Sequence, residues 1–180
     1  TITIAVVRLS SIDDKKNVDL VFAFAPGKGS FFPEYILDYY NKTDSTNYQY
    51  YAFALSKSKL HFIDLHEFFI SNKNKLKHPI FSQIGVHWSD YAAFLAADTI
   101  SKYISKLRNI KMPEINITNF EQVDTIKRTD RDAAELMNLF SAPSGYEMPY
   151  LTFSSKRNNA SLVPKLLTVA DSYFSNIVAT

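Results

Sequence analysis

The sequence lacks three features that would narrow its function at once. It contains no cysteine, which excludes disulfide bonds, zinc-thiolate sites and cysteine nucleophiles. It has no long apolar run, because stretches such as 19–26 and 166–170 are far shorter than the roughly 20 residues that cross a bilayer. It also has no excess of one charge. The formal net charge is +2 and the lysines are scattered, so nothing favours binding to nucleic acid or to an anionic membrane surface.

What is present is typical of a globular protein. The chain has 180 residues, of which 46% are apolar, and this length suits one domain better than two. We therefore expect a single domain over residues 1–180. No basic segment followed by an apolar one occurs at the start, so we expect any export signal or membrane anchor to precede Thr1.

Short apolar segments alternate with amphipathic ones along the chain. Strands are predicted over 18–25, 60–64, 114–128 and 165–170, and helices over 31–40, 48–58, 65–74 and 130–140. The clearest helix begins after Ser89, its natural N-cap, and a last helix starts at 171–176. This order predicts an α/β fold of three layers, in which helices cover both faces of a mainly parallel sheet. Ligands bind at the carboxyl ends of such strands, which places 26–28 and 171–172 on the same rim.

Ser172 follows a predicted strand and begins a predicted helix. A serine on such a turn can present its hydroxyl to a cleft, while N–H groups at the helix start stabilise an oxyanion. The alternative is that Asp171 or Ser172 only caps the helix. A serine nucleophile also needs a base, and the chain offers four histidines: His61, His66, His78 and His87.

His87 is the best placed of these histidines, because it directly precedes the well-capped helix. Its local sequence leaves open whether it is a base, a metal ligand or a packed neighbour. His66 lies near Asp64 and Glu67, and these three could ligate a metal. Their spacing matches neither an i, i+4 histidine pair nor HExxH, so a surface role is favoured. We expect no metal and no cofactor.

Three segments resemble the SGNH-hydrolase-like proteins related to the alginate O-acetylation proteins, and they follow one another along the chain in the same order as in that family. "GVHWS" and the small-residue helix after it, from Gly85, resemble the family's D-x-H-W segment. "DLVFAFAPGKGSFFPEY", from Asp19, resembles its strand, proline and lysine, and "LLTVADSYFSN" resembles its nucleophile turn. The resemblance implies a flavodoxin-like, SGNH-type fold with a catalytic Ser172 and His87 as its base. The histidine precedes the serine, which implies a circularly permuted order. Because the chain ends soon after Ser172, we expect further sequence beyond Thr180.

Gly85 departs from the family pattern, which has an aspartate at this position to orient the imidazole. Glycine has no side chain to accept a hydrogen bond. The site therefore uses a backbone carbonyl, takes an acid from elsewhere or has lost activity. Asp90 is the candidate acid, although its place in the first helical turn is also explained by the helix dipole. Asp130 and Asp132 resemble a polar segment of the family, but helix capping is the simpler interpretation of both.

The resemblance implies an O-acetyltransferase or acetylesterase that acts on a cell-surface or secreted polysaccharide. Its partners would be the polysaccharide, an acetyl donor and envelope assembly proteins, in the periplasm or at the cell surface. Lys28 and Trp88 are the expected substrate contacts; the alternatives are a solvated lysine and a packing tryptophan. A non-catalytic carbohydrate-binding or assembly protein with a degenerate site is the alternative function, and an unrelated α/β domain is the third.

Overall fold

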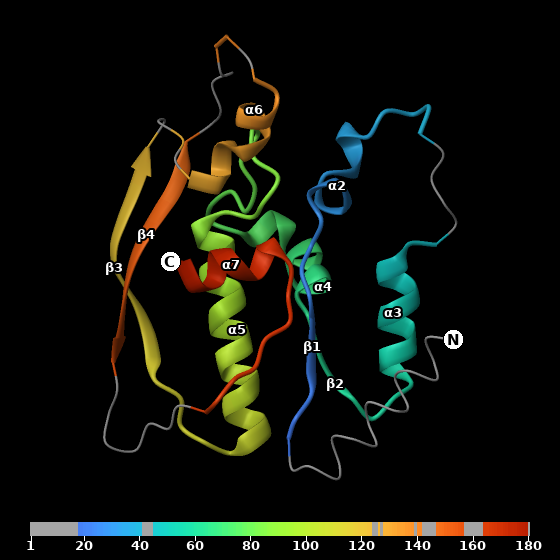
Figure 1. Cartoon of the computed structure of the whole chain (residues 1–180), viewed down its shortest axis with the longest axis vertical. Helices are drawn as coiled ribbons and strands as arrows, with labels where there is room; N and C mark the ends of the chain where they lie inside the picture. Colours follow the sequence, from blue (N-terminus) through green and yellow to red (C-terminus); the bar gives the residue numbers. More distant parts are fainter. Residues whose placement is uncertain are drawn as a thin grey trace. The chain divides into compact units, whose positions relative to one another are not determined.

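The chain divides into two compact units, residues 1–74 and residues 75–180. The computed structural model, drawn in Figure 1, describes residues 18–40, 45–123, 126, 128–138, 140–141, 147–156 and 164–179. Whether the two units form one domain stays a prediction. Among the residues described, no helix is both long enough and apolar enough to span a bilayer.

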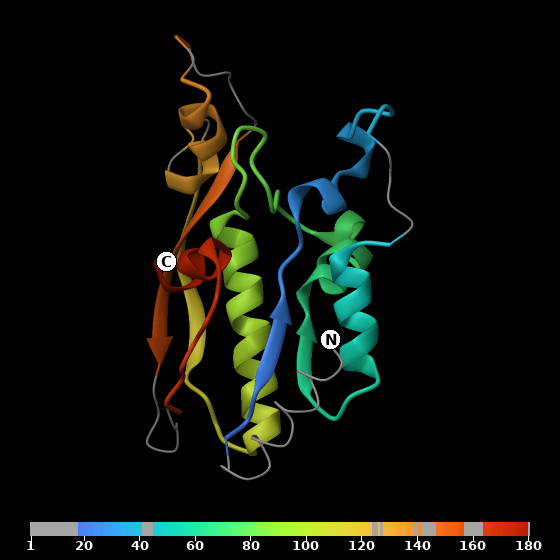
Figure 2. The same ribbon diagram turned by 45° about the vertical axis from the view of Figure 1, so that its right-hand side comes forward.

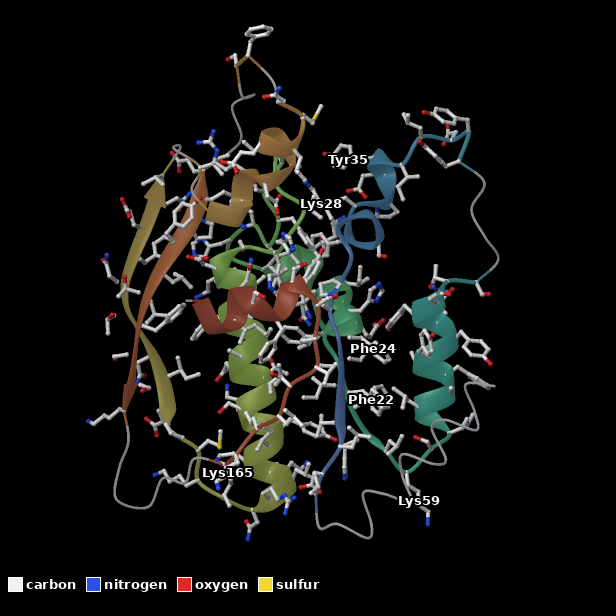
Figure 3. All side chains as sticks on the ribbon, in the orientation of Figure 1. Phe22, Phe24, Lys28, Tyr35, Lys59 and Lys165 are labelled. Atoms are coloured by element: carbon white, nitrogen blue, oxygen red, sulfur yellow. The ribbon has the colours of Figure 1, made fainter. Side chains whose placement is uncertain are left out.

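The first unit is built on two parallel strands, β1 (Val21–Phe24) and β2 (His61–Asp64). Helix α3 (Asn47–Ser56) precedes β2 and begins with a capping box, and helix α4 (Leu65–Ser71) follows β2 directly. A short 3-10 turn, Lys73–Lys75, comes next. Alternate residues of β1 share a face, so Phe22 and Phe24 point the same way (Figure 3), and Phe24 packs edge-on against Tyr48 of α3. The strands predicted over 18–25 and 60–64 and the helices predicted over 48–58 and 65–74 are confirmed, with shorter bounds.

The helix predicted over 31–40 is wrong. Helix α2 covers only Lys28–Phe31, and a 3-10 turn covers Pro33–Tyr35. Pro33 is the reason, because a proline disfavours the helical conformation in the residue before it. Phe32 accordingly has φ −122° and ψ 62°, outside the helical region.

The second unit is organised around helix α5 (Asp90–Arg108), which runs beside an antiparallel strand pair in Figures 1 and 2. The pair consists of β3 (Glu114–Val123) and β4 (Met148–Lys156). The Ser89 side chain accepts the N–H of Ala92, so the predicted N-cap is confirmed. Ala92, Ala93 and Ala96 in the first half of α5 are buried, and Phe94 between them stacks on Phe153 of β4 at 5.5 Å between ring centroids.

Two shorter helices complete the second unit. Helix α6 (Asp132–Leu136) follows a 3-10 turn, Arg128–Arg131, so the helix predicted over 130–140 is present but shorter. Helix α7 (Ser172–Ala179) contacts α5, and Figures 1 and 2 show it lying across the amino-terminal half of that helix. The predicted start of this last helix is confirmed.

The buried strand predicted over 165–170 is wrong. Residues 164–171 have no regular structure, and Leu167 and Val169 are 95% and 98% exposed. An apolar run becomes a strand only when a neighbouring strand satisfies its backbone N–H and C=O groups, and none of the described strands pairs with it. The α/β class is confirmed, but of the two described sheets only the β1–β2 pair is parallel.

Ser89 offers a direct test of this architecture, because its side chain caps α5 and also donates to Pro79 O at 2.8 Å. Ser89→Ala should lower the free energy of unfolding by about 1 kcal/mol or more, since a cap is lost. Ser101→Ala, in the middle of the same helix, is the matched control and should change it by less than about 0.5 kcal/mol. Urea unfolding followed by circular dichroism measures both, and equal effects would contradict the capping role.

Candidate active site

The loop before α5 holds His87 in a defined place. Ile84 packs against a buried cluster formed by Ile126, Met148 and Tyr150. Trp88 is 2% exposed and forms an isolated bridge with Phe81, and the Ser89 N–H donates to Ile80 O at 2.8 Å. Because residues on both sides of His87 are anchored, its imidazole projects from a fixed backbone.

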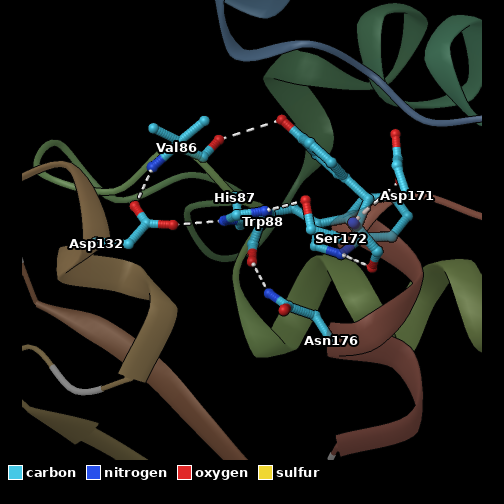
Figure 4. A network of polar contacts seen from close by, with 8 residues as sticks. Val86, His87, Trp88, Asp132, Asp171, Ser172 and Asn176 are labelled. Carbon is cyan, nitrogen blue, oxygen red and sulfur yellow. Dashed lines mark hydrogen bonds and ion pairs between the residues drawn. The ribbon is translucent and has the colours of Figure 1, made fainter. Parts of the chain in front are cut away.

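Ser172 and His87 lie within hydrogen-bond distance. Ser172 is the first residue of α7, and its Oγ is 2.7 Å from Nε2 of His87 (Figure 4). The His87 side chain is 19% exposed, so the pair lies at the solvent-accessible surface. This separation is the reach that direct proton transfer between a hydroxyl and an imidazole requires.

Asp132 supplies the carboxylate at the other ring nitrogen. Its Oδ2 contacts His87 Nδ1, and its Oδ1 accepts the N–H of Val86 at 2.6 Å (Figure 4). A carboxylate only accepts hydrogen bonds, so Nδ1 carries the proton of a neutral His87 and Nε2 presents a lone pair to Ser172. The same carboxylate thus sets the orientation of the ring and its tautomer.

The acid beside His87 is therefore Asp132 and not Asp90. Asp90 lies in the first turn of α5 and is 6% exposed, so the expectation that it orients the imidazole is corrected. Helix capping was also an incomplete interpretation of Asp132, because both of its carboxylate oxygens contact the loop that carries His87. A backbone hydrogen bond from Ala134 N–H to Ile84 O, 3.1 Å long, holds α6 against that loop.

Asp171, and not Ser172, caps the first turn of α7. The Asp171 Oδ1 accepts the Tyr173 N–H at 3.1 Å and so satisfies an N–H of the first turn of α7. Ser172 is not needed for that bond, and its hydroxyl contacts His87 instead.

Sequence reasoning missed Tyr173 and Asn176, which connect α7 to the loop that carries His87; Figure 4 labels Asn176. Asn176 Nδ2 donates to Trp88 O, and Trp88 Nε1 donates to Tyr173 O, both at 3.1 Å. Residues 172 and 176 are four apart and share one face of a helix, which was the available signal. Tyr173 is adjacent to the serine, and only its tertiary contacts reveal it.

The Tyr173 hydroxyl donates to Val86 O at 3.1 Å. Burial, with the negative charges of Asp171 and Asp132, raises the pKa of Tyr173 to about 12. The hydroxyl therefore stays protonated, and stays a donor, at any pH near neutral.

The structure bears differently on Trp88 and Lys28, the two residues expected to contact substrate. Trp88 is buried and its indole N–H is bonded to Tyr173 O, so the expectation that its ring contacts substrate is corrected: it packs and anchors the loop. Lys28 begins α2 in the first unit (Figure 3), and its contact with substrate stays a prediction.

The other histidines lie in separate environments. His66 stacks on Tyr48 with ring centroids 3.8 Å apart, and burial lowers its pKa. The Asp64 carboxylate accepts the Tyr48 hydroxyl and the Glu67 N–H, both at 2.8 Å. Within the described part of the chain, no group of three or more candidate ligands is arranged to hold a metal ion.

A comparison with protein families gives one match over most of the chain. The model of the SGNH hydrolase-like domain of the acetyltransferase AlgX matches residues 8–169. The chain belongs to this family. The match to the SGNH hydrolase-like domain ends before Ser172, so the place of that residue in the site rests on its geometry.

Two proteins of known structure are similar to this chain in fold. The O-acetyltransferase domain of Pseudomonas putida AlgJ is 16% identical, with a TM-score of 0.52 over 76% of this chain and 49% of that one. Bacillus cereus PatB1, in a structure with a sulfonyl adduct, is 18% identical, with a TM-score of 0.54 over 83% and 48%. The chain thus spans about half the length of these structures. No curated protein sequence matches it.

The raised pKa of Tyr173 predicts a pH dependence of stability. A free tyrosine loses its proton near pH 10, so between about pH 10 and 12 the folded state binds more protons than the unfolded state, and stability falls as pH rises. Tyr173→Phe should lose less stability over this window than the wild type. Tyr50→Phe, at a half-exposed tyrosine, is the control and should follow the wild type. Urea unfolding at pH 9, 10 and 11 measures this, and parallel curves for wild type and Tyr173→Phe would contradict it.

Proposed function

We propose that this domain catalyses acetyl transfer through an acetyl-serine intermediate, as an O-acetyltransferase whose acceptor is a hydroxyl of a cell-surface or secreted polysaccharide. The observation that carries the proposal is the chain of contacts from Ser172 Oγ through His87 to Asp132. Membership of the SGNH hydrolase-like acetyltransferase family supports the choice of acetyl as the group transferred.

The proposed reaction has two halves. In the first, Ser172 Oγ attacks the acetyl carbonyl of the donor while His87 Nε2 takes the hydroxyl proton. The tetrahedral intermediate then collapses, the donor oxygen leaves with the proton from His87, and acetyl-Ser172 remains. In the second half, a sugar hydroxyl gives its proton to His87 and attacks the acetyl group, and Ser172 regains a proton. With water as the acceptor, the same steps make the domain an acetylesterase.

Electrostatics at the site favours these steps. The Asp132 carboxylate stabilises the imidazolium that forms when His87 takes a proton. Ser172 lies at the amino-terminal end of α7, where the helix dipole is positive and opposes the charge of an oxyanion. The Tyr173 N–H is already bonded to Asp171, so the oxyanion must draw on other donors in this conformation.

The non-catalytic alternative rested on Gly85, which removes the orienting acid of the family pattern. Asp132 contacts the same imidazole from α6, which supports a working site over a degenerate one. AlgJ, which is similar in fold, has an O-acetyltransferase domain, and PatB1 forms a sulfonyl adduct. A polysaccharide acceptor outside the cytoplasm would place this domain in the periplasm or at the cell surface, where an acetyl donor and assembly proteins are its partners.

Removal of the serine or its base should abolish turnover. Ser172→Ala and His87→Ala should each lower kcat for p-nitrophenyl acetate by about 10³-fold or more, because residual catalysis comes only from binding and oxyanion stabilisation. Release of p-nitrophenol measures this, and Ser175→Ala, on the same helix, is the matched control. If Ser172→Ala retained wild-type turnover, the acetyl-serine mechanism would be wrong.

Asp132 and Asp90 should differ sharply when changed to asparagine. Asp132→Asn replaces an acceptor with an amide, which disturbs the tautomer of His87, and we expect kcat to fall by up to about 10⁴-fold. Asp90→Asn keeps a residue suited to the first turn and should leave kcat near the wild-type value. The reverse result would return the role of the acid to Asp90.

Gly85→Asp in the Asp132→Asn background would test whether the position of the acid is interchangeable. Gly85 has no positive φ, so its backbone accepts a side chain without the left-handed strain that would exclude one. We expect a partial recovery of kcat relative to Asp132→Asn alone. The single variant Gly85→Asp is the control for damage to the loop.

A further inference from the structure

Both backbone polar groups of Val86 are held by side chains of the site. Its N–H donates to Asp132 Oδ1 at 2.6 Å, and its carbonyl accepts the Tyr173 hydroxyl at 3.1 Å (Figure 4). Val86 directly precedes His87. The acid on α6 and a tyrosine on α7 therefore fix the same residue from two sides, and the backbone between them carries the imidazole.

Tyr173 contacts the histidine loop in three further ways. Its ring lies 5.2 Å from the imidazole of His87 and 5.3 Å from the indole of Trp88, measured between centroids. Its backbone carbonyl accepts the indole N–H of Trp88 at 3.1 Å. Because Tyr173 is covalently joined to Ser172, each of these contacts also constrains the position of the serine relative to the imidazole.

These contacts matter because the segment before α7 provides little support. Residues 164–171 pair with none of the described strands, and Leu166, Leu167 and Val169 are exposed. In a serine site on a strand-to-helix turn, the preceding strand normally holds the nucleophile. Here the placement of Ser172 depends on what α7 itself contacts.

We propose that Tyr173 is the positioning residue of the site, and that its hydroxyl, through the carbonyl of Val86, holds His87 Nε2 within reach of Ser172 Oγ. The inference rests on the proposed function, because it concerns the same serine and histidine. Tyr173 is not a catalytic residue: its hydroxyl contacts a backbone carbonyl and not a reacting atom. It acts through Val86 on the imidazole and through the peptide bond on the serine.

The test measures the reactivity of Ser172 without any acetyl donor or polysaccharide. Phenylmethanesulfonyl fluoride sulfonylates an activated serine: a bond forms between Oγ and sulfur, fluoride leaves, and the hydroxyl proton passes to the histidine. The full chain is labelled and then digested, and mass spectrometry of the peptides gives the site, the rate and the final extent of labelling. Tyr173→Phe keeps the ring and removes only the hydroxyl, and Tyr50→Phe is the matched control.

We expect Tyr173→Phe to be labelled about three- to tenfold more slowly than the wild type, the range that loss of one neutral hydrogen bond supports. Its final extent of labelling should equal that of the wild type, which separates slower chemistry from a misfolded fraction. The labelling rate should have the same pH midpoint as in the wild type and a lower maximum, because Tyr173 stays protonated near neutral pH. With p-nitrophenyl acetate, kcat should fall and KM should not change.

The outcomes distinguish this inference from the proposed function. Wild-type protein labelled at Ser172, with an equal rate in Tyr173→Phe, would overturn the positioning role alone. A slower rate with a lower final extent would mean that Tyr173 only maintains the fold, and would overturn it too. No labelling of Ser172 in the wild type would overturn both the proposed function and this inference.

Discussion

The arrangement of the site depends on one carboxylate with two contacts. Asp132 accepts the N–H of Val86 through one oxygen and contacts Nδ1 of His87 through the other. The backbone bond fixes where the carboxylate lies, and the imidazole contact then fixes the ring and its tautomer. Gly85, at the position of the family's aspartate, has no side chain that could take its place. Two elements, α6 and the loop before α5, are thereby joined into one site.

A second set of contacts brings the nucleophile to this pair. Helix α7 meets the loop through Ser172, Tyr173 and Asn176, and the loop meets α7 through the indole of Trp88. Neutral hydrogen bonds contribute modestly one at a time, but several between the same two segments restrict their relative motion together. Trp88 is central to this restriction because its ring is buried and its indole N–H donates to the backbone carbonyl of Tyr173. The result is a serine whose position is set by neighbours in space more than by the chain before it.

How much the sequence could predict depended on whether the cause was local. Strand β1, helix α3 and helix α5 follow from residue composition, period and caps, all of which lie within the segment itself. The helix predicted over 31–40 fails for an equally local reason, because Pro33 disfavours the helical conformation at Phe32. Residues 165–170 contain strand-forming residues, but pairing needs a second strand, which no local pattern guarantees. Asp132 is 45 residues from His87, and its surroundings resemble an ordinary helix start, so only the tertiary structure identifies it as the acid.

The central claim is that Ser172 becomes acetylated with His87 as its base. The most direct measurement is to mix the protein with p-nitrophenyl acetate, stop the reaction in acid within the first turnover, and locate acetyl groups by peptide mass spectrometry. The account predicts one acetyl group on the peptide that contains Ser172 in the wild type, and little or none there in His87→Ala at the same time point. Acetyl absent from Ser172, or present to the same extent in both proteins, would contradict it.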